Sequence, residues 1–203
     1  MSSIQKLTEL FSDFPGIGPR QARRFVYFLL TRNDAYLNNL KNVIGDLKND
    51  IRVCESCFRF FQDNAAHSVQ CEICRSPNRD ASLLIIVARD IDLENIEKAH
   101  SHNGLYFVLG GGVPILEKNP ESRIRSKQLL EILQERPKLQ EIILAMNATP
   151  EGENTADYIE SLLQEISTEK NIKISHLGRG ISTGTELEYS DTDTIKNALK
   201  NRQ

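Results

Sequence analysis

CESC at residues 54–57 and CEIC at residues 71–74 are two Cys-x-x-Cys pairs, separated by thirteen residues, and they contain all four cysteines of the chain. Both sulfurs of such a pair can reach one metal ion, so two pairs supply the four thiolates of a closed tetrahedral zinc site. Four protein ligands leave no position for water or a substrate, which predicts a structural metal rather than a catalytic one. The predicted ligands of one Zn²⁺ per chain are Cys54, Cys57, Cys71 and Cys74.

The alternative use of the four cysteines is a set of two disulfide bonds, which would require an oxidising compartment. The start of the chain, MSSIQKLTELF, lacks the continuous apolar stretch of a signal peptide, and no run reaches the roughly 18 residues of a membrane span. We therefore expect a cytoplasmic protein whose reduced cysteines bind zinc, which can order a segment too small to bury a core. His67, between the two pairs, could substitute for a ligand, but an exposed loop histidine is the simpler interpretation.

The composition indicates a soluble protein with a local excess of positive charge. The chain has 203 residues, 39% of them hydrophobic, and a net charge of −3, which suits one large or two small domains and argues against a general nucleic-acid coat. Residues 1–80 carry 11 basic and 9 acidic side chains, whereas residues 81–203 carry 14 and 19. Any affinity for phosphate is therefore expected in the N-terminal part.

Residues 14–19, Phe-Pro-Gly-Ile-Gly-Pro, predict a tight turn between two helices. Apolar residues recur at helical spacing over residues 4–11, which indicates a short amphipathic helix before the turn. Gly16 and Gly18 allow a tight turn with close backbone approach, and Pro19 suits the first turn of a second helix.

The second helix combines an apolar stripe with a basic face. The stripe consists of Ala22, Phe25, Val26 and Leu29, and Arg20, Arg23 and Arg24 lie on or beside the other face. A Gly-x-Gly turn that opens a helix points backbone N–H groups outward at the positive end of the helix dipole, where a phosphate can bind. Arginines one turn later can bind the neighbouring phosphates. An ordinary helix–turn–helix with solvated arginines is the alternative, but the complete pattern favours DNA binding through Gly16, Gly18, Arg20, Arg23 and Arg24.

A third helix is predicted from Asp34 to about Asp50. Its apolar residues recur at helical spacing and are expected to pack inward. These residues are Leu37, Leu40, Val43, Ile44 and Leu47.

From residue 81 onward, strand and helix patterns alternate along the chain. Apolar strands are predicted at 83–87, 105–109, 141–146 and 172–177, with helices at about 92–100, 121–133, 153–166 and 191–200. This alternation predicts an α/β fold, in which a mostly parallel sheet is covered by helices on both sides. Ligands of such sheets bind beyond the carboxyl ends of the strands.

Acidic residues after the third strand raise the alternative of a metal-dependent enzyme. Glu151, Glu153 and Asp157 could bind Mg²⁺ at the carboxyl end of the sheet. The first strand, however, ends at Ala88 and the third at Asn147, where catalytic carboxylates would be expected. Acidic residues are also common in the first turns of a helix, where they complement its dipole.

These pieces, in this order, resemble the bacterial recombination mediator family RecR over nearly the whole chain. The resemblance is carried by Phe14–Arg20, the four cysteines, Asn78–Asp80, Glu141–Thr155, and Gly180 with Glu186–Tyr189. It implies a helix–hairpin–helix DNA-binding domain at residues 1–53, a four-cysteine zinc finger at 54–77, a Toprim-like α/β domain at 78–178, and a C-terminal segment with a helix at 179–203 that is exchanged between subunits.

The resemblance also implies a non-catalytic function in DNA repair. Members form ring-shaped tetramers that bind single- and double-stranded DNA regardless of sequence and act with RecO and RecF to load RecA at single-strand gaps. The two basic DNA contacts of the family fall on Arg20 and Arg24. A Toprim-type metal-dependent nuclease or primase remains the alternative, and Ala88 and Asn147 stand against it. A zinc-stabilised scaffold without a DNA role would leave the basic helix unexplained.

Overall fold

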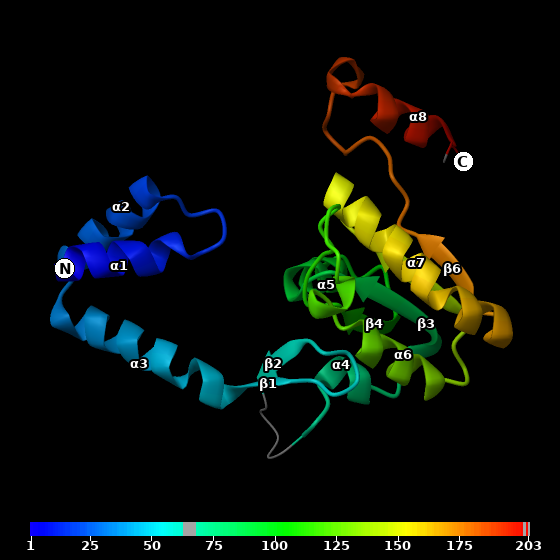
Figure 1. Cartoon of the computed structure of the whole chain (residues 1–203), viewed down its shortest axis with the longest axis horizontal. Coiled ribbons are helices and arrows are strands. Elements are labelled where there is room, and N and C mark those ends of the chain that lie inside the picture. The colour runs from blue at the N-terminus through cyan, green and yellow to red at the C-terminus, as the bar shows by residue number, and fades with distance from the viewer. Residues whose placement is uncertain (63–67, 201, 203) are drawn as a thin grey trace. The chain divides into compact units, whose positions relative to one another are not determined.

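The computed structural model describes residues 1–62, 68–200 and 202, and the chain divides into two compact units (Figure 1). Unit 1 is Met1–Ile51 and unit 2 is Arg52–Gln203. His67, between the cysteine pairs, lies outside the described residues. No helix in the described part of the chain is both long enough and apolar enough to cross a membrane.

Unit 1 contains three helices, α1 (Ser3–Ser12), α2 (Pro19–Leu30) and α3 (Asp34–Asp50). A capping box starts α1, in which the Ser2 N–H donates to Gln5 Oε1 (2.9 Å) and the Gln5 N–H donates to Ser2 Oγ (3.3 Å). In the turn before α2, Gly16 adopts a φ of +75°, a left-handed conformation that favours glycine. Pro19 occupies the first turn of α2, so the predicted helix–turn–helix is present.

The apolar stripe of α2 faces α1, as predicted. Ala22 and Val26 are buried, and Phe25 and Leu29 are half-buried. The Phe25 ring meets the Phe11 ring of α1 edge to face, with centroids 5.9 Å apart. This packing leaves the arginines of α2 on the exposed side of the helix.

The third helix has the predicted bounds, but the inward packing predicted for its second half is wrong. Leu37 and Leu40 are half-buried, whereas Val43, Ile44 and Leu47 are 57%, 62% and 58% exposed. The physical reason is that α1 and α2 pack chiefly against each other, so no element within unit 1, all of whose residues are described, covers this end of α3.

Unit 2 is built on a four-stranded parallel sheet in the order β4-β3-β5-β6. Its strands are β3 (Asp80–Val87), β4 (Gly104–Val108), β5 (Glu141–Ala145) and β6 (Lys173–His176). Its helices are α5 (Asp90–Lys98), α6 (Ser126–Gln134), α7 (Pro150–Lys170) and α8 (Thr192–Lys200), with short 3₁₀ turns η1 (Pro120–Ser122) and η2 (Leu187–Tyr189). The alternation predicted from the sequence is therefore confirmed, although α6 starts later than expected and α7 is longer at both ends.

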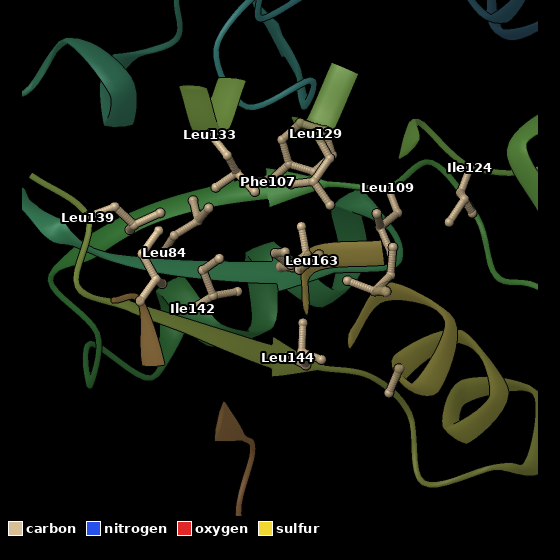
Figure 2. Packing of buried hydrophobic residues seen from close by; sticks show 14 of the residues in the cluster. Leu84, Phe107, Leu109, Ile124, Leu129, Leu133, Leu139, Ile142, Leu144 and Leu163 are labelled. Atoms are coloured by element: carbon tan, nitrogen blue, oxygen red, sulfur yellow. The ribbon is translucent and has the colours of Figure 1, made fainter. Parts of the chain in front are cut away.

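Successive residues of a strand point to opposite sides of the sheet, so each strand contributes apolar side chains to both faces. Both faces are covered by other elements. On one face, α6 and α7 pack leucines such as Leu129, Leu133 and Leu163 against the strands, as Figure 2 shows from close by. The members of this cluster include Leu84, Ile86, Phe107, Leu129, Leu133, Ile142, Ile159 and Leu163. The continuous apolar run at 83–87 is thus a strand buried on both faces, as expected for a parallel sheet.

The opposite face is shared by α5 and the cysteine-containing segment. This segment comprises the hairpin β1 (Ile51–Val53) and β2 (Phe60–Gln62) and the short helix α4 (Glu72–Arg75). Three of the cysteines form one apolar cluster with Phe61, Ile73, Ile85, Val87, Leu93, Tyr106 and Val108. The segment that contains the two Cys-x-x-Cys pairs is therefore part of the core of unit 2.

Candidate metal centre and candidate nucleic-acid interface

The structure brings the four cysteine sulfurs together. Their Sγ atoms all lie within 4.8 Å of one another, and those of Cys57 and Cys71 are 3.6 Å apart. Four sulfurs around one tetrahedral zinc ion, each about 2.3 Å from the metal, would lie about 3.8 Å apart. A disulfide would instead need about 2.05 Å. The donor set and its spacing therefore fit a single metal ion with four thiolate ligands.

Local turns aim the sulfurs at a common point. The Cys54 N–H donates to the Arg59 carbonyl and the Cys54 carbonyl accepts the Phe58 N–H, both at 2.9 Å. Phe58 closes this turn with a φ of +60°. In the second pair, Cys71 is the N-terminal cap of α4, and its N–H donates to Cys54 Sγ at 3.3 Å. An N–H donor of this kind stabilises a thiolate.

The cysteines also influence one another's protonation. Hydrogen bonds from Cys57, Cys71 and Cys74, in that order of strength, lower the pKa of Cys54 below its ordinary value. The same contacts, chiefly the one with Cys54, raise the pKa of Cys57. A metal ion, which takes thiolates and releases their protons, would relieve this competition.

The sheet holds the cysteine segment through polar contacts as well as through the core. The Val108 N–H of β4 donates to the Cys57 carbonyl at 2.8 Å. Arg125, which precedes α6, donates from Nη1 to the carbonyls of Val108 (2.9 Å) and Phe58 (3.3 Å). These bonds fix the first cysteine pair on the edge strand of the sheet.

Arg136, which follows α6, is a residue of this centre that the sequence did not reveal. Its Nη2 donates to the Ser56 carbonyl at 3.3 Å, while its Nη1 is buried and has no hydrogen-bond partner among the described residues. Burial lowers the pKa of this guanidinium. A metal with four thiolates carries a net charge of about −2, which this cation would partly neutralise. No local pattern links positions that are 80 residues apart in the chain.

The exposed face of α2 gathers the predicted DNA contacts. Arg20, Arg23 and Arg24 are exposed, and Gly16 and Gly18 lie in the exposed turn before them. Arg24 Nη1 donates to Gln21 Oε1 at 3.2 Å, whereas no ion pair engages Arg20 or Arg23 in the part of the chain that the structure describes. The role of these residues in DNA binding stays a prediction.

This face includes one residue that the sequence argument missed. A hollow of about 390 Å³ is lined by Pro19, Arg20, Arg23, Arg24 and Tyr27. Tyr27 follows Arg20, Arg23 and Arg24 at seven, four and three residues, which places it on the same side of the helix. That spacing was the signal available in the sequence.

In the part of the chain that the structure describes, no cluster of metal-ligating carboxylates forms at the carboxyl end of the sheet. Ala88 and Asn147 line a small pocket of about 30 Å³ together with Glu151. Glu153 instead pairs with Arg179 (Oε1 to Nη1, 2.6 Å). Among the described residues, the cysteines form the one group of metal-ligating side chains close enough to share an ion.

Comparison with known families agrees with this architecture. Residues 4–47 match the family described as RecR, helix-hairpin-helix, residues 82–178 match the Toprim domain, and residues 180–203 match the family described as RecR, C-terminal. The predicted fold class, a helix–hairpin–helix followed by a cysteine cluster and a parallel Toprim sheet, is confirmed.

Curated relatives match along almost the entire chain. The Recombination protein RecR of Bifidobacterium animalis subsp. lactis is 35% identical over 201 residues, which cover 99% of this chain and 96% of the relative. The protein of the same name from Rhodopseudomonas palustris is 34% identical over 199 residues, covering 98% and 94%. The one from Bradyrhizobium sp. is 35% identical over 199 residues, covering 98% and 95%. By its sequence and its domain content, the chain belongs to the RecR family of recombination proteins.

Proposed function

We propose that this chain is a non-catalytic recombination mediator that binds DNA through the exposed face of α2. It acts as a ring-shaped homotetramer with RecO and RecF to load RecA at single-strand gaps. The observation that carries the proposal is the exposed group of three arginines at the start of α2, in a chain of the RecR family. None of these three arginines makes an ion pair with a described residue, so they can bind phosphates without first breaking one.

The contacts that we assign to DNA are of the kind that ignores sequence. Gly16 and Gly18 expose the backbone of the turn, and Arg20, Arg23 and Arg24 provide guanidinium groups within the first two turns of the helix. Such groups bind phosphate oxygens and fix orientation, but they carry no information about the bases. Binding should therefore depend steeply on salt and little on sequence.

We assign Zn²⁺ to Cys54, Cys57, Cys71 and Cys74, one ion per chain. The support is the set of four sulfur donors with the separations described above. A site closed by four protein ligands supplies structural order and no reactive water. The ion would link the hairpin β1–β2 to helix α4.

The assembly into a tetramer is supported by apolar side chains that a single chain leaves exposed. In unit 1 these are Val43, Ile44 and Leu47 of α3. In the C-terminal segment, residues 179–203, they include Leu187, Tyr189 and Leu199, which are 64%, 76% and 59% exposed. We propose that two subunits cover each other's exposed surface on α3. We also propose that subunits exchange the C-terminal segment, residues 179–203.

The alternative, a Toprim-type metal-dependent nuclease or primase, is disfavoured by the residues at the end of the sheet. Mg²⁺ catalysis of phosphoryl transfer needs converging carboxylates. Ala88 and Asn147 occupy two of the positions, and Glu153 is paired with Arg179. Cleavage or extension of DNA with Mg²⁺ that disappears in Glu151→Gln would favour this alternative over the mediator.

The experiment that tests the proposal is DNA binding by the double variant Arg20→Ala/Arg24→Ala over a range of salt concentrations. Affinity should fall for all sequences alike, and the slope of log K against log salt should become shallower by about one unit per arginine. A matched control, Lys41→Ala/Lys48→Ala, removes the same charge from exposed positions of α3 and should leave the slope within about half a unit of the parent.

Zinc content and oligomeric state of the Arg20→Ala/Arg24→Ala variant should equal those of the parent, because neither arginine lies on the apolar stripe of α2. Equal affinity and equal salt slope for the Arg20→Ala/Arg24→Ala variant and the parent would place DNA elsewhere on the protein.

A further inference from the structure

Tyr27 adds an aromatic surface to the basic face of α2. Its side chain is 54% exposed and forms one wall of the hollow that Arg20, Arg23 and Arg24 also line. Pro19 forms another wall, and the exposed walls are largely apolar. The apolar stems of the arginines contribute to such a surface while their guanidinium groups remain in water. The hollow thus combines a π face with cations at its rim.

Among the described residues, Tyr27 has no ring contact and no hydrogen bond, which sets it apart from the other exposed aromatic residues of unit 1. Phe28 and Tyr36 pack edge to face, with centroids 6.3 Å apart, and the Arg32 guanidinium lies 4.0 Å from the centre of the Phe28 ring. Those rings are engaged within the unit. The ring of Tyr27 is available to a ligand.

A surface that combines an aromatic ring with cations should bind single-stranded and duplex DNA differently. A duplex presents its phosphates to cations and hydrogen-bond donors, but its bases are stacked inside, so the face of an aromatic ring has no free base to stack on. A single strand presents phosphates and unstacked bases together, and its binding sites combine a positively charged groove with aromatic side chains. The hollow on α2 has the composition of the second kind of site.

We propose that Tyr27 is a base-stacking residue that makes the α2 face prefer single-stranded over duplex DNA. The inference rests on the proposed DNA-binding function of the same face. Arg20, Arg23 and Arg24 hold the phosphates of a strand, and one of its bases stacks on the Tyr27 ring. The arginines supply affinity for any DNA, and the tyrosine supplies the difference between the two forms.

The test compares a fifteen-nucleotide oligothymidine with a fifteen-base-pair duplex as ligands for the full-length chain. Tyr27→Ala should weaken binding of the oligothymidine by about tenfold or more, because stacking on an aromatic side chain contributes about that much per base. Binding of the duplex should stay within about twofold of the parent. Tyr27→Phe keeps the ring and should bind both ligands as the parent does.

A matched control is Tyr36→Ala, which removes an exposed tyrosine that does not line the hollow. It should leave the ratio of the two affinities unchanged. The mass of each variant is measured by light scattering, so that a change of assembly is recognised.

The other outcomes overturn the inference. Equal loss on both ligands would show that Tyr27 supports the helix or a subunit contact, and a change of mass would identify the latter. A Tyr27→Ala variant that binds both ligands like the parent would overturn this inference alone, while the Arg20→Ala/Arg24→Ala result could still support DNA binding. A parent chain that binds neither ligand would overturn the inference and the proposed function together.

Discussion

Units 1 and 2 differ in how much of their apolar surface they bury. In unit 2, both faces of the sheet are covered, and many strand residues, such as Leu84, Ile86 and Phe107, are completely buried. In unit 1, all of whose residues are described, Ala22 and Val26 are the only buried side chains, and neither α1 nor α3 contributes any. One unit closes its own core, and the other leaves most of its apolar surface open.

The difference indicates where each unit gets its stability. Apolar burial contributes about 25 cal/mol per Å², so the sheet of unit 2 stabilises itself. In its cysteine segment, the described side chains that are buried besides cysteines are Phe61 and Ile73, so we expect this segment to need the metal in addition. Unit 1 is a pair of packed helices with a long third helix, and we expect another chain to cover its exposed apolar residues. The predictions below test each half of this contrast.

Removal of the metal should have the largest effect, and it should be confined to unit 2. Elemental analysis of the purified protein should find about one zinc per chain, and Cys71→Ser should abolish its retention. Because structural zinc binds with an apparent free energy of about 10–16 kcal/mol, the cysteine segment should lose its order without it. Hydrogen exchange should then rise at Phe61 and Ile73, which pack in the cysteine cluster.

Unit 1 serves as the internal control for metal removal, since the amides of α1 and α2 should exchange at an unchanged rate. Intact disulfides and no metal in the purified protein would refute the zinc assignment. Loss of order in α1 after removal of zinc would show that the two units depend on each other.

The exposed end of α3 should control assembly. The double variant Val43→Asp/Leu47→Asp places two charges on the surface that we expect another copy to cover. Each buried side chain of this size contributes about 1.5–3 kcal/mol, so the subunit dissociation constant should rise by about a thousandfold or more. Sedimentation or light scattering over a range of protein concentrations measures this change.

The matched control is Asn42→Asp/Asn49→Asp, which adds the same charge on the opposite side of α3. It should leave the mass unchanged. If the Val43→Asp/Leu47→Asp variant keeps the mass of the parent, subunits do not meet on this surface, and the open core of unit 1 has another explanation.

The same contrast explains what the sequence could predict. Local sequence patterns correctly indicated the apolar strand at 83–87, the turn at Gly16 and the convergence of the two Cys-x-x-Cys pairs. Periodicity also identifies which face of a helix is apolar, but it does not say whether anything in the same chain covers that face. This is why Leu37 was placed correctly and Leu47 was not.

Contacts between distant positions were the other part that could not be predicted. Arg136 reaches the Ser56 carbonyl across 80 residues, and its place beside the cysteines depends on how α6 packs on the sheet. The late start of α6 was missed for a local reason, because the short η1 turn over Pro120–Ser122 precedes the helix. Tyr27 was within reach of the helical pattern, but aromatic residues on helices usually belong to a core.

A pair of glycine substitutions compares the packing of the two units directly, beginning with Gly152→Ala in unit 2. Gly152 lies in the first turn of α7, where a Cβ would lie only 2.1 Å from the Asn147 carbonyl oxygen. Because a backbone carbonyl cannot move aside as a flexible side chain can, the free energy of unfolding of the variant should fall by about 3 kcal/mol. Denaturant unfolding monitored on unit 2 measures the loss, and an unchanged midpoint would mean that the loop at Asn147 can move.

Gly45→Ala is the counterpart in unit 1, and its expected effect is the smallest and of opposite sign. Gly45 lies inside α3, its φ is not in the left-handed region, and a Cβ there would meet no atom within 4 Å. Alanine in a helix interior is favoured over glycine by about 0.5–1 kcal/mol, so α3 should be stabilised. Hydrogen exchange of the α3 amides should slow by about two- to fivefold, because local opening becomes that much rarer. If Gly45→Ala instead speeds exchange or lowers the mass of the assembly, a neighbouring subunit packs closely against Gly45, and the surface covered on α3 extends beyond its apolar face.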